Sequence, residues 1–338
     1  MQTCIEKRNK DNVGLSNNQV YCTFDGNTEA PLPMLVRNLL ARQQTTWPQL
    51  KAGYDALTKL RIRRLEVGEH SILLQCNPQR IVSTGADINP VAIQTRACFL
   101  CPSNLPLMQQ AIFCHRQWLV LCNPFPIFPQ HFTVAHVQHL PQSLNDAWPS
   151  LLQLTRDFQP DFALLYNGPQ CGASAPDHLH FQAVPKKAIP ALNGGREKMK
   201  QVWQRGGLTL LRTTTDPLAA FLLAGSAYEE LIACLASLSN AMQSVLPSAG
   251  EPLLNLFSHY EEGRWHIMVF PRRQHRPAAY YQSGQEQILL SPGAVDMGGL
   301  LVLPREADYN CLDSKILFDI FKEISVSEDL LAKIVAAL

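Results

Sequence analysis

The sequence has almost no net charge and no long apolar run, and both absences narrow the functions that it can have. Lys and Arg total 29 and Asp and Glu total 28, which gives a formal net charge of +1. This balance does not favour binding to nucleic acid or to an anionic membrane surface. No run of about 18 apolar residues is present, so we expect no membrane-spanning helix. The opening residues, MQTCIEKRNKDN, lack the apolar segment that a signal peptide requires.

Low-complexity segments and strict repeats are also absent, as is typical of a globular protein. The chain has 338 residues, of which 46% are hydrophobic, so it can bury a sizeable core. This length favours two domains or two halves over one. The chain has ten cysteines, and we expect it to have no signal peptide. We therefore expect a cytoplasmic protein with reduced thiols, most of them buried as small apolar side chains.

Apolar spacing in the first part of the chain predicts both helices and strands. Residues Pro33 to Leu60 have helical spacing that is interrupted near Trp47-Pro48, which predicts two helices. A further helix is predicted over residues 142–158. Short β-rich or apolar runs predict strands at residues 70–78, 117–122, 131–137, 162–169 and 178–186.

The second part of the chain loosely repeats this order. Asp216-Pro217 predicts the start of a helical region that extends to about Val245. After it we predict a hairpin over residues 253–273 that turns at 261–263, a strand pair around Met297-Gly298-Gly299, and an amphipathic helix from about Ser314.

We therefore expect an α+β fold of two related halves, each an antiparallel sheet with flanking helices. The predicted divisions are an N-terminal arm with helices (1–65), a catalytic half (66–195) and a second, related half (196–338).

The segment GASAPDHLHFQAVPK, residues 172–186, carries the clearest functional pattern. His178, His180 and Gln182 occupy alternate positions, so in a strand they point to one face. A neutral imidazole, with a pKa of ~6.5, can act as a nucleophile at neutral pH and form a phosphoramidate. The alternative is an accidental His-x-His on a solvated strand face, because so short a motif is only a hypothesis until its context agrees.

The loop before this strand consists of small residues. Gly172, Ala173 and Ser174 allow backbone N–H groups to approach phosphate oxygens closely, and Ser174 adds a hydroxyl donor. The loop and the strand together therefore predict a site for phosphoryl chemistry.

The stretch NGPQCGASAPDHLHFQ resembles the active-site segment of the histidine-triad superfamily. It is similar to the transferase branch, which includes galactose-1-phosphate uridylyltransferase, diadenosine tetraphosphate phosphorylase and GDP-L-galactose phosphorylase. The resemblance implies that His180 is the nucleophile, that Gln182 binds the phosphate, and that Asn167 and Ser174 help to hold the phosphates. The hydrolase branch has a third histidine where this chain has Gln182, so transfer or phosphorolysis is favoured over hydrolysis.

By this resemblance the protein is a nucleotidyltransferase of the phosphorylase type that works by ping-pong transfer. The nucleotide substrate is a dinucleoside polyphosphate or a nucleoside-diphosphate sugar, and inorganic phosphate or a sugar phosphate accepts the nucleotidyl group from His180. Two alternatives stay open: a histidine-triad nucleotide hydrolase, and a non-catalytic nucleotide-binding regulatory protein. Related enzymes can pair through this sheet, so the resemblance also leaves a homodimer open.

The match to the superfamily covers roughly residues 70–190 and includes NPFPIFPQHFTVAHVQHLPQ, which resembles its nucleoside-binding strand and loop. Asn123 is then the ribose contact. Phe125 and Phe128 either line the base pocket or belong to the core.

A C-x-x-C pair suggests a metal. Cys98 and Cys101 can chelate one tetrahedral zinc, but a structural site needs about four ligands. The zinc site of galactose-1-phosphate uridylyltransferase, which the pattern resembles, implies that His136 and His178 supply the other two, with His139 as an alternative to His136. Two buried thiols without metal, or a redox pair, are the other readings of this motif.

One basic cluster stands out in the nearly neutral chain. The segment FPRRQHRP contains Arg272, Arg273, His275 and Arg276. Arginine forms bidentate contacts with phosphate, so these residues are candidates to bind the substrate phosphates. The alternative is a solvated turn after a strand.

Overall fold

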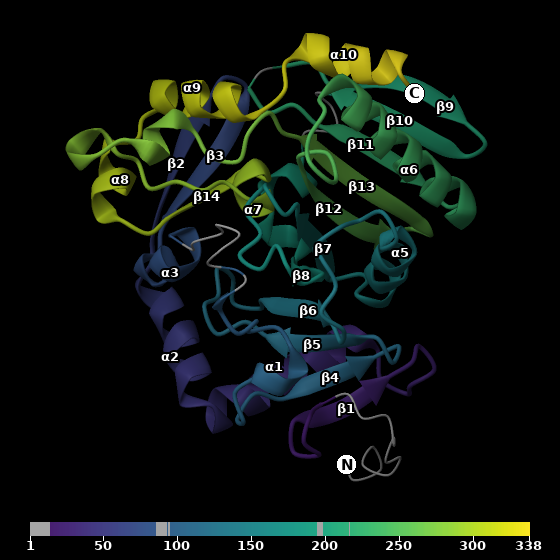
Figure 1. Ribbon diagram of the computed structural model, residues 1–338, viewed down its shortest axis with the longest axis vertical. Coiled ribbons are helices and arrows are strands. Elements are labelled where there is room, and N and C mark those ends of the chain that lie inside the picture. Colours follow the sequence, from purple (N-terminus) through teal and green to yellow (C-terminus); the bar gives the residue numbers. More distant parts are fainter. Residues whose placement is uncertain (1–13, 86–92, 94, 195–198, 216) are drawn as a thin grey trace.

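The computed structural model describes residues 14–85, 93, 95–194, 199–215 and 217–338 (Figure 1). The fold is mixed α+β, as the sequence predicts, and its strands form an eleven-stranded sheet and a three-stranded sheet. The large sheet has the strand order β1-β4-β5-β6-β8-β7-β12-β13-β11-β10-β9. Both predicted halves therefore contribute strands to one continuous sheet.

The same order of elements occurs twice along the chain. The first half consists of β4 (Ala111–Cys114), β5 (Trp118–Cys122), β6 (Phe132–His136), α5 (Trp148–Asp157), β7 (Phe162–Asn167) and β8 (His180–Pro185). The second half consists of β9 (Met199–Arg205), β10 (Leu208–Thr213), β11 (Phe221–Gly225), α6 (Tyr228–Val245), β12 (Leu254–Glu261) and β13 (Arg264–Pro271). In each half the fifth strand lies between the third and the fourth, and all pairs are antiparallel. Antiparallel pairing of β7 with β12 joins the halves.

The N-terminal segment extends the first half. β1 (Val20–Phe24) pairs with β4 in parallel, and helices α1 (Leu32–Thr46) and α2 (Pro48–Ala56) follow it. The break between these helices is at Trp47, whose backbone is extended, and Pro48 takes the first helical position of α2. The two predicted helices are therefore confirmed. Residues 1–13 of the predicted arm lie outside the described residues.

The small sheet joins segments that are distant in sequence. β2 (Arg61–Val67) and β3 (His70–Cys76) form a hairpin, and β14 (Leu300–Leu303) pairs with β3 in parallel. The boundary predicted after residue 65 therefore falls inside β2.

Near the C-terminus, the described residues contain only the second strand of the pair predicted around Met297-Gly298-Gly299, as β14. The part before β14 contains the short helix α7 (Ala294–Met297). The other helices there are α8 (Glu306–Cys311), α9 (Ser314–Ile324) and α10 (Glu328–Ala336). The remaining short helical turns are Leu57–Lys59, Pro78–Arg80, Ile81–Thr84, Pro102–Asn104, Lys186–Ala188, Pro190–Leu192, Ala278–Tyr281 and Gly284–Glu286.

The helix predicted from Asp216-Pro217 to Val245 is only partly correct. Asp216 lies outside the described residues, and Phe221–Gly225 forms β11 before helix α6 begins at Tyr228. All five residues of β11 are buried, and the strand pairs with both β10 and β13. A short apolar run of this kind has no periodicity that separates strand from helix.

The large sheet is covered on both faces. Helices α1, α2, α5, α6 and α10 pack on one face, and Phe181 of β8 points into this core. The small sheet, α7 and α9 cover much of the other face, to which Val184 of β8 belongs. Because side chains alternate along a strand, His180 and Gln182 share the face of Val184. The predicted face for these two residues is thus confirmed.

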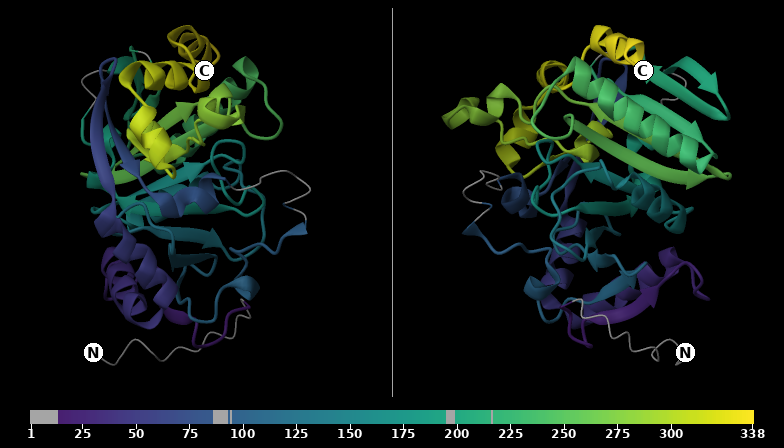
Figure 2. Two further views of the ribbon diagram at one scale, coloured as in Figure 1. Left: turned by 90° about the vertical axis from the view of Figure 1, so that its left-hand side faces the viewer. Right: turned by 45° about the vertical axis from the view of Figure 1, so that its right-hand side comes forward.

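Helix α10 lies at the opposite end of the molecule from α1 and α2 (Figure 2, yellow and purple). No helix within the described residues is both long and apolar enough to cross a lipid bilayer.

Candidate functional site

His180 is the first residue of β8, and only 4% of its surface is exposed. Its Nδ1 lies 2.8 Å from the carbonyl oxygen of His178. A carbonyl can only accept a hydrogen bond, so Nδ1 carries the proton and Nε2 keeps its lone pair. Burial lowers the pKa of His180 to about 4, so the ring is neutral at pH 7. A neutral imidazole with one fixed N–H and one bare nitrogen is suited to nucleophilic attack.

Gln142 holds the backbone of this residue in place. The Gln142 Oε1 accepts from the His180 N–H at 2.8 Å. The Gln142 Nε2 donates to the carbonyl oxygens of His180 at 3.1 Å and of Asn167 at 2.9 Å. This side chain therefore ties the start of β8 to the end of β7. No local pattern predicts this contact, because it joins residues that are 38 positions apart.

Gln182 is oriented by another side chain that the sequence analysis missed. The Gln182 Oε1 lies 2.7 Å from Nε2 of His131, a fully buried residue. The Nδ1 of the same ring accepts from the Ile127 N–H at 3.1 Å. His131 thus connects the Pro-rich loop before β6 to β8.

The loop of small residues packs against the second half. Gly172 has a φ of +92°, and a Cβ there would lie 2.8 Å from Cα of Gly293. Glycine is therefore required at residue 172 both by its backbone conformation and by the close approach of the two loops. Ala173 is buried, and Ser174 is half-buried with no side-chain hydrogen bond to the described part of the chain.

Asn167, at the end of β7, accepts hydrogen bonds from other parts of the protein with its side-chain oxygen. Its Oδ1 accepts from Nδ2 of Asn255 at 2.9 Å and from the Ala294 N–H at 2.7 Å. The amide nitrogen is thereby the end of this side chain that is left for a ligand. Asn255 is itself held by Arg272, whose guanidinium donates to the Asn255 Oδ1 at 2.5 Å.

The first basic residue of the segment FPRRQHRP is enclosed within the protein. Arg272 is only 1% exposed and donates to oxygens of Asn255, Gln274, His275, Pro292 and Ile324. The prediction that Arg272 contacts substrate is therefore wrong; its role is to hold Asn255 and two loops.

Of the other three basic residues, two share a partner: His275 and Arg276 both contact the Ser291 hydroxyl. The Arg273 N–H donates to Ile324 and its side chain is exposed. His275 faces Ser291 at 3.1 Å, and burial lowers its pKa to about 3. Arg276 lies over the ring of Tyr280 at 4.1 Å.

Arg80 is a half-buried cation that the sequence analysis passed over. It donates to the Phe125 carbonyl at 3.0 Å. Burial lowers its pKa to about 10, against the effect of the Asp296 charge, so it stays protonated at pH 7. Gln75 and Asn77 bind the next carbonyls of the same loop, those of Ile127 and Pro126. The segment QCNPQR thus clamps the Pro-rich loop beside His131.

The predicted nucleoside contacts lie around this loop. The Asn123 Oδ1 accepts from the Phe125 N–H at 2.9 Å, and its Nδ2 lies 3.5 Å from Oγ1 of Thr133. Thr133 pairs with Gln182 across β6 and β8, so Asn123 is close to the site. Phe128 is buried in the core, whereas Phe125 is half-buried.

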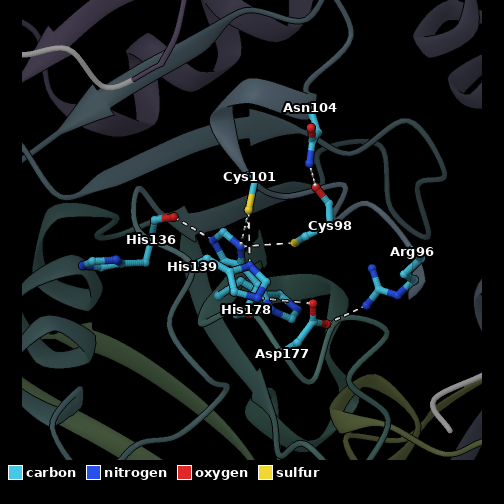
Figure 3. Close-up of polar contacts among 9 residues, drawn as sticks. Arg96, Cys98, Cys101, Asn104, His136, His139, Asp177 and His178 are labelled. Atoms are coloured by element: carbon cyan, nitrogen blue, oxygen red, sulfur yellow. Dashed lines mark hydrogen bonds and ion pairs between the residues drawn. The ribbon is translucent and has the colours of Figure 1, made fainter. Parts of the chain in front are cut away.

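Two cysteines and two histidines form a cluster (Figure 3). One of them, His178, accepts the hydrogen bond from Nδ1 of His180 through its carbonyl. The ligand atoms of Cys98, Cys101, His139 and His178 all lie within 4.8 Å of one another. The His178 Nδ1 is 3.3 Å from the Cys98 Sγ and 3.6 Å from the Cys101 Sγ, and the His139 Nδ1 is 3.2 Å from the Cys101 Sγ. This group is able to bind a metal ion.

Neighbouring groups orient both rings for such a role. The His178 Nε2 donates to the His136 carbonyl at 2.7 Å, which leaves Nδ1 bare toward the cysteines. The His139 Nε2 lies 3.6 Å from a carboxylate oxygen of Asp177, and Arg96 holds the other oxygen of that carboxylate at 2.6 Å. Such second contacts to backbone carbonyls and carboxylates are typical of metal-binding histidines.

His136 was predicted as a ligand, and the structure excludes it from the cluster. It is the last residue of β6, with the same parity as Phe132 and Val134, which point to the helix-covered core. Its ring stacks edge-on against Trp118 at 5.1 Å. His139, three residues farther along in the loop, takes the place instead. His178 is also not in the strand, because β8 begins two residues later.

Comparison with known proteins adds a family model and one solved structure. A family model described as a domain of unknown function, DUF4922, matches residues 39–185. The chain is also similar to the crystal structure of a DUF4931 family protein from Bacillus cereus ATCC 10987. The two share 16% identity over 54% of this chain and 93% of that one, with a TM-score of 0.33. No curated protein matches the chain. We therefore argue the function from the site itself.

Proposed function

We propose that this protein is a nucleotidyltransferase of the histidine-triad transferase branch that acts as a phosphorylase through a nucleotidyl-His180 intermediate. Its substrate is a dinucleoside polyphosphate or a nucleoside-diphosphate sugar. The observation that carries the proposal is the hydrogen bond from Nδ1 of His180 to the His178 carbonyl, because it fixes the tautomer in which Nε2 is free to attack.

The reaction has two displacements at one phosphorus. In the first, the lone pair of His180 Nε2 forms an N–P bond while the bond from the α-phosphorus to the leaving oxygen breaks, and that oxygen departs with the electron pair. In the second, an oxygen of inorganic phosphate or of a sugar phosphate attacks the same phosphorus. The N–P bond then breaks and its electron pair returns to Nε2.

The surrounding groups support this chemistry by donating hydrogen bonds. The amide nitrogens of Gln182 and Asn167 are available because both side-chain oxygens are bound within the protein. The loop from Gly172 to Ser174 adds backbone N–H groups. Donors that are fixed before the reaction stabilise charge on the phosphoryl oxygens in the transition state. Each such donor typically raises kcat by a factor of about 10²–10³.

A zinc ion fits the cluster beside the nucleophile, held by Cys98, Cys101, His139 and His178. Tetrahedral zinc, with Zn–S near 2.3 Å and Zn–N near 2.0–2.1 Å, places its ligand atoms about 3.3–3.8 Å apart. The three separations above, 3.2, 3.3 and 3.6 Å, are close to this range. When bound, zinc supplies a structural crosslink between the loop before β4 and the turn before β8. His178 then presents its carbonyl to His180 from a fixed position.

The test is intact-protein mass spectrometry in phosphate-free buffer, with ATP, diadenosine tetraphosphate, GDP-sugars and UDP-sugars supplied one at a time. We expect the mass of one nucleoside monophosphate to be added by one of them, and to be lost on a chase with phosphate or a sugar phosphate. His180→Ala should give no adduct. His259→Ala is the matched control, because His259 is a buried strand histidine of the second half.

Besides the lack of an adduct in the wild type, two results would overturn the proposal. An adduct that persists in His180→Ala would place the nucleophile elsewhere. Turnover of a nucleotide to its monophosphate in water, with no phosphate requirement, would favour the hydrolase alternative.

A further inference from the structure

Three groups form a hydrogen-bonded chain that ends at the candidate site. The Ile127 N–H faces Nδ1 of His131, and Nε2 of His131 faces Oε1 of Gln182. A backbone N–H can only donate, so Nδ1 of His131 must be the acceptor and carry no proton. The single proton of the neutral ring is therefore on Nε2, and it is donated to Gln182.

The hydrogen bonds through His131 remove the usual ambiguity in the orientation of a glutamine amide. Because Nε2 of His131 is a donor, the Gln182 atom that faces it must be oxygen. The NH2 group of Gln182 is then the end turned toward a ligand, and it offers only donors. Such a group selects for an acceptor, such as a phosphoryl oxygen. Gln182 and His180 are two residues apart on one face of β8, so about 6.6 Å separates them along the strand.

The ring of His131 stays neutral where it lies. Burial, and after it the nearby charge of Arg80, lower its pKa to about 3. Arg80 is itself fixed on the Phe125 carbonyl of the same loop. A protonated His131 ring would have no acceptor for the Ile127 N–H. The hydrogen bonds from Ile127 through His131 to Gln182 therefore form only when the ring is neutral.

We propose that His131 is a positioning residue for the transfer reaction: it turns the amide of Gln182 so that the NH2 group, and not the oxygen, meets the substrate phosphate. The catalytic part of this inference rests on the proposed function, whereas the orientation of the amide does not. The competing explanation is that His131 only supports the Pro-rich loop, since its backbone also bonds with the hydroxyl of Tyr54.

Two substitutions separate these explanations. His131→Asn can keep an acceptor for the Ile127 N–H, but its side chain is too short to reach Gln182. His131→Gln can place an amide N–H near the position of Nε2, but it loses the acceptor for Ile127. A positioning role predicts that the Asn variant lowers kcat about 100-fold with KM little changed, the usual effect of losing one preorganised donor. The Gln variant should recover most of that loss.

A double-mutant cycle with Gln182→Ala completes the kinetic test. If His131 acts through Gln182, His131→Asn will lower kcat no further in a Gln182→Ala background. Equal losses in the Asn and Gln variants, or losses that multiply with that of Gln182→Ala, would overturn the positioning role and leave support of the loop.

A second measurement needs no turnover. Nuclear magnetic resonance of protein with ¹⁵N-labelled histidine reports which ring nitrogen of His131 carries the proton. We expect the Nε2–H form from pH 6 to pH 8, with a shift of the Nε2 signal in Gln182→Leu. An Nδ1–H form would overturn the inferred orientation. Lack of a nucleotidyl adduct in the wild type would refute the proposed function, and this spectrum would still decide how Gln182 is oriented.

Discussion

Glu251 provides a direct test of the structure at the junction of the two halves. The residue precedes β12 and is only 6% exposed, and its carboxylate oxygens accept from the Leu144 N–H at 2.8 Å and from the Tyr166 hydroxyl at 2.5 Å. Both partners belong to the first half. Burial raises the pKa of Glu251 from 4.5 to about 7, although the two hydrogen bonds oppose this effect.

The sign of the effect on stability follows from proton binding. Between pH 4.5 and about 7 the folded protein holds a proton on Glu251 that the unfolded chain has lost. The stabilisation is therefore complete below pH 4.5 and disappears as the pH rises through 7. The pKa difference corresponds to about 3.4 kcal/mol at about 1.36 kcal/mol per unit. About 2.5 kcal/mol of this is lost between pH 5 and pH 8.

Glu251→Gln removes this titration without changing the size of the side chain. We expect the free energy of unfolding of the variant, relative to wild type, to rise by about 2.5 kcal/mol from pH 5 to pH 8, as measured by urea unfolding at both pH values. Glu261→Gln is the control. Lys186 lowers the pKa of this exposed carboxylate, so its contribution is lost only in acid. A difference for Glu251→Gln that does not change with pH would refute a buried, protonated carboxyl.

Three further predictions concern the site. The purified protein should contain one zinc ion per chain by elemental analysis; Cys98→Ser should lower this content and His136→Ala should not. Gly172→Ala should lower the free energy of unfolding by about 1–3 kcal/mol, because φ is positive there and a Cβ would collide with Gly293; a thermal melt unchanged from wild type would contradict this. Arg272→Lys should destabilise by about 2–4 kcal/mol in urea, because several buried oxygens lose their donor.

The sequence predicted best what depends on local periodicity. His180 and Gln182 lie on one face of a strand because side chains alternate along it, and that strand was predicted within two residues. The same rule explains the mistake at His136. The predicted strand over residues 131–137 already contains His136, with the same parity as Phe132 and Val134, but its role as a ligand was taken from the family resemblance and not from this alternation. His136 lies on the side of β6 that faces the helix-covered core, and His139 in the following loop is the ligand candidate.

Contacts between distant segments could not be predicted in this way. His131 and Gln182 are 51 residues apart in sequence, and the bond of Asn255 to Asn167 spans 88 residues. Each depends on which strands are neighbours in the sheet, which local patterns do not determine. Arg272 shows the opposite case: a cluster of cations in sequence suggested a surface that binds anions, but the first residue of the cluster is buried inside the protein.

The repeated order of elements leads to a last prediction, about the number of active sites. His180 pairs with Ala135 near the end of β6, and His266 pairs with Ala224 at the corresponding place in β11. Gln182 lies two residues after His180, and Met268 lies two residues after His266, so Met268 is the counterpart of Gln182. Its side chain has no amide to donate a hydrogen bond.

Met268 instead lines a largely apolar cavity of about 430 Å³ together with Met199, Phe270 and Met297. Because a thioether donates no hydrogen bond, the second half lacks the amide donor that we propose for the first. We therefore expect one nucleotidyl group per chain at saturation, counted by intact mass, and the same count in His266→Ala. Two groups per chain would mean that both halves act as nucleophiles, and the role assigned to the amide of Gln182 would then fail.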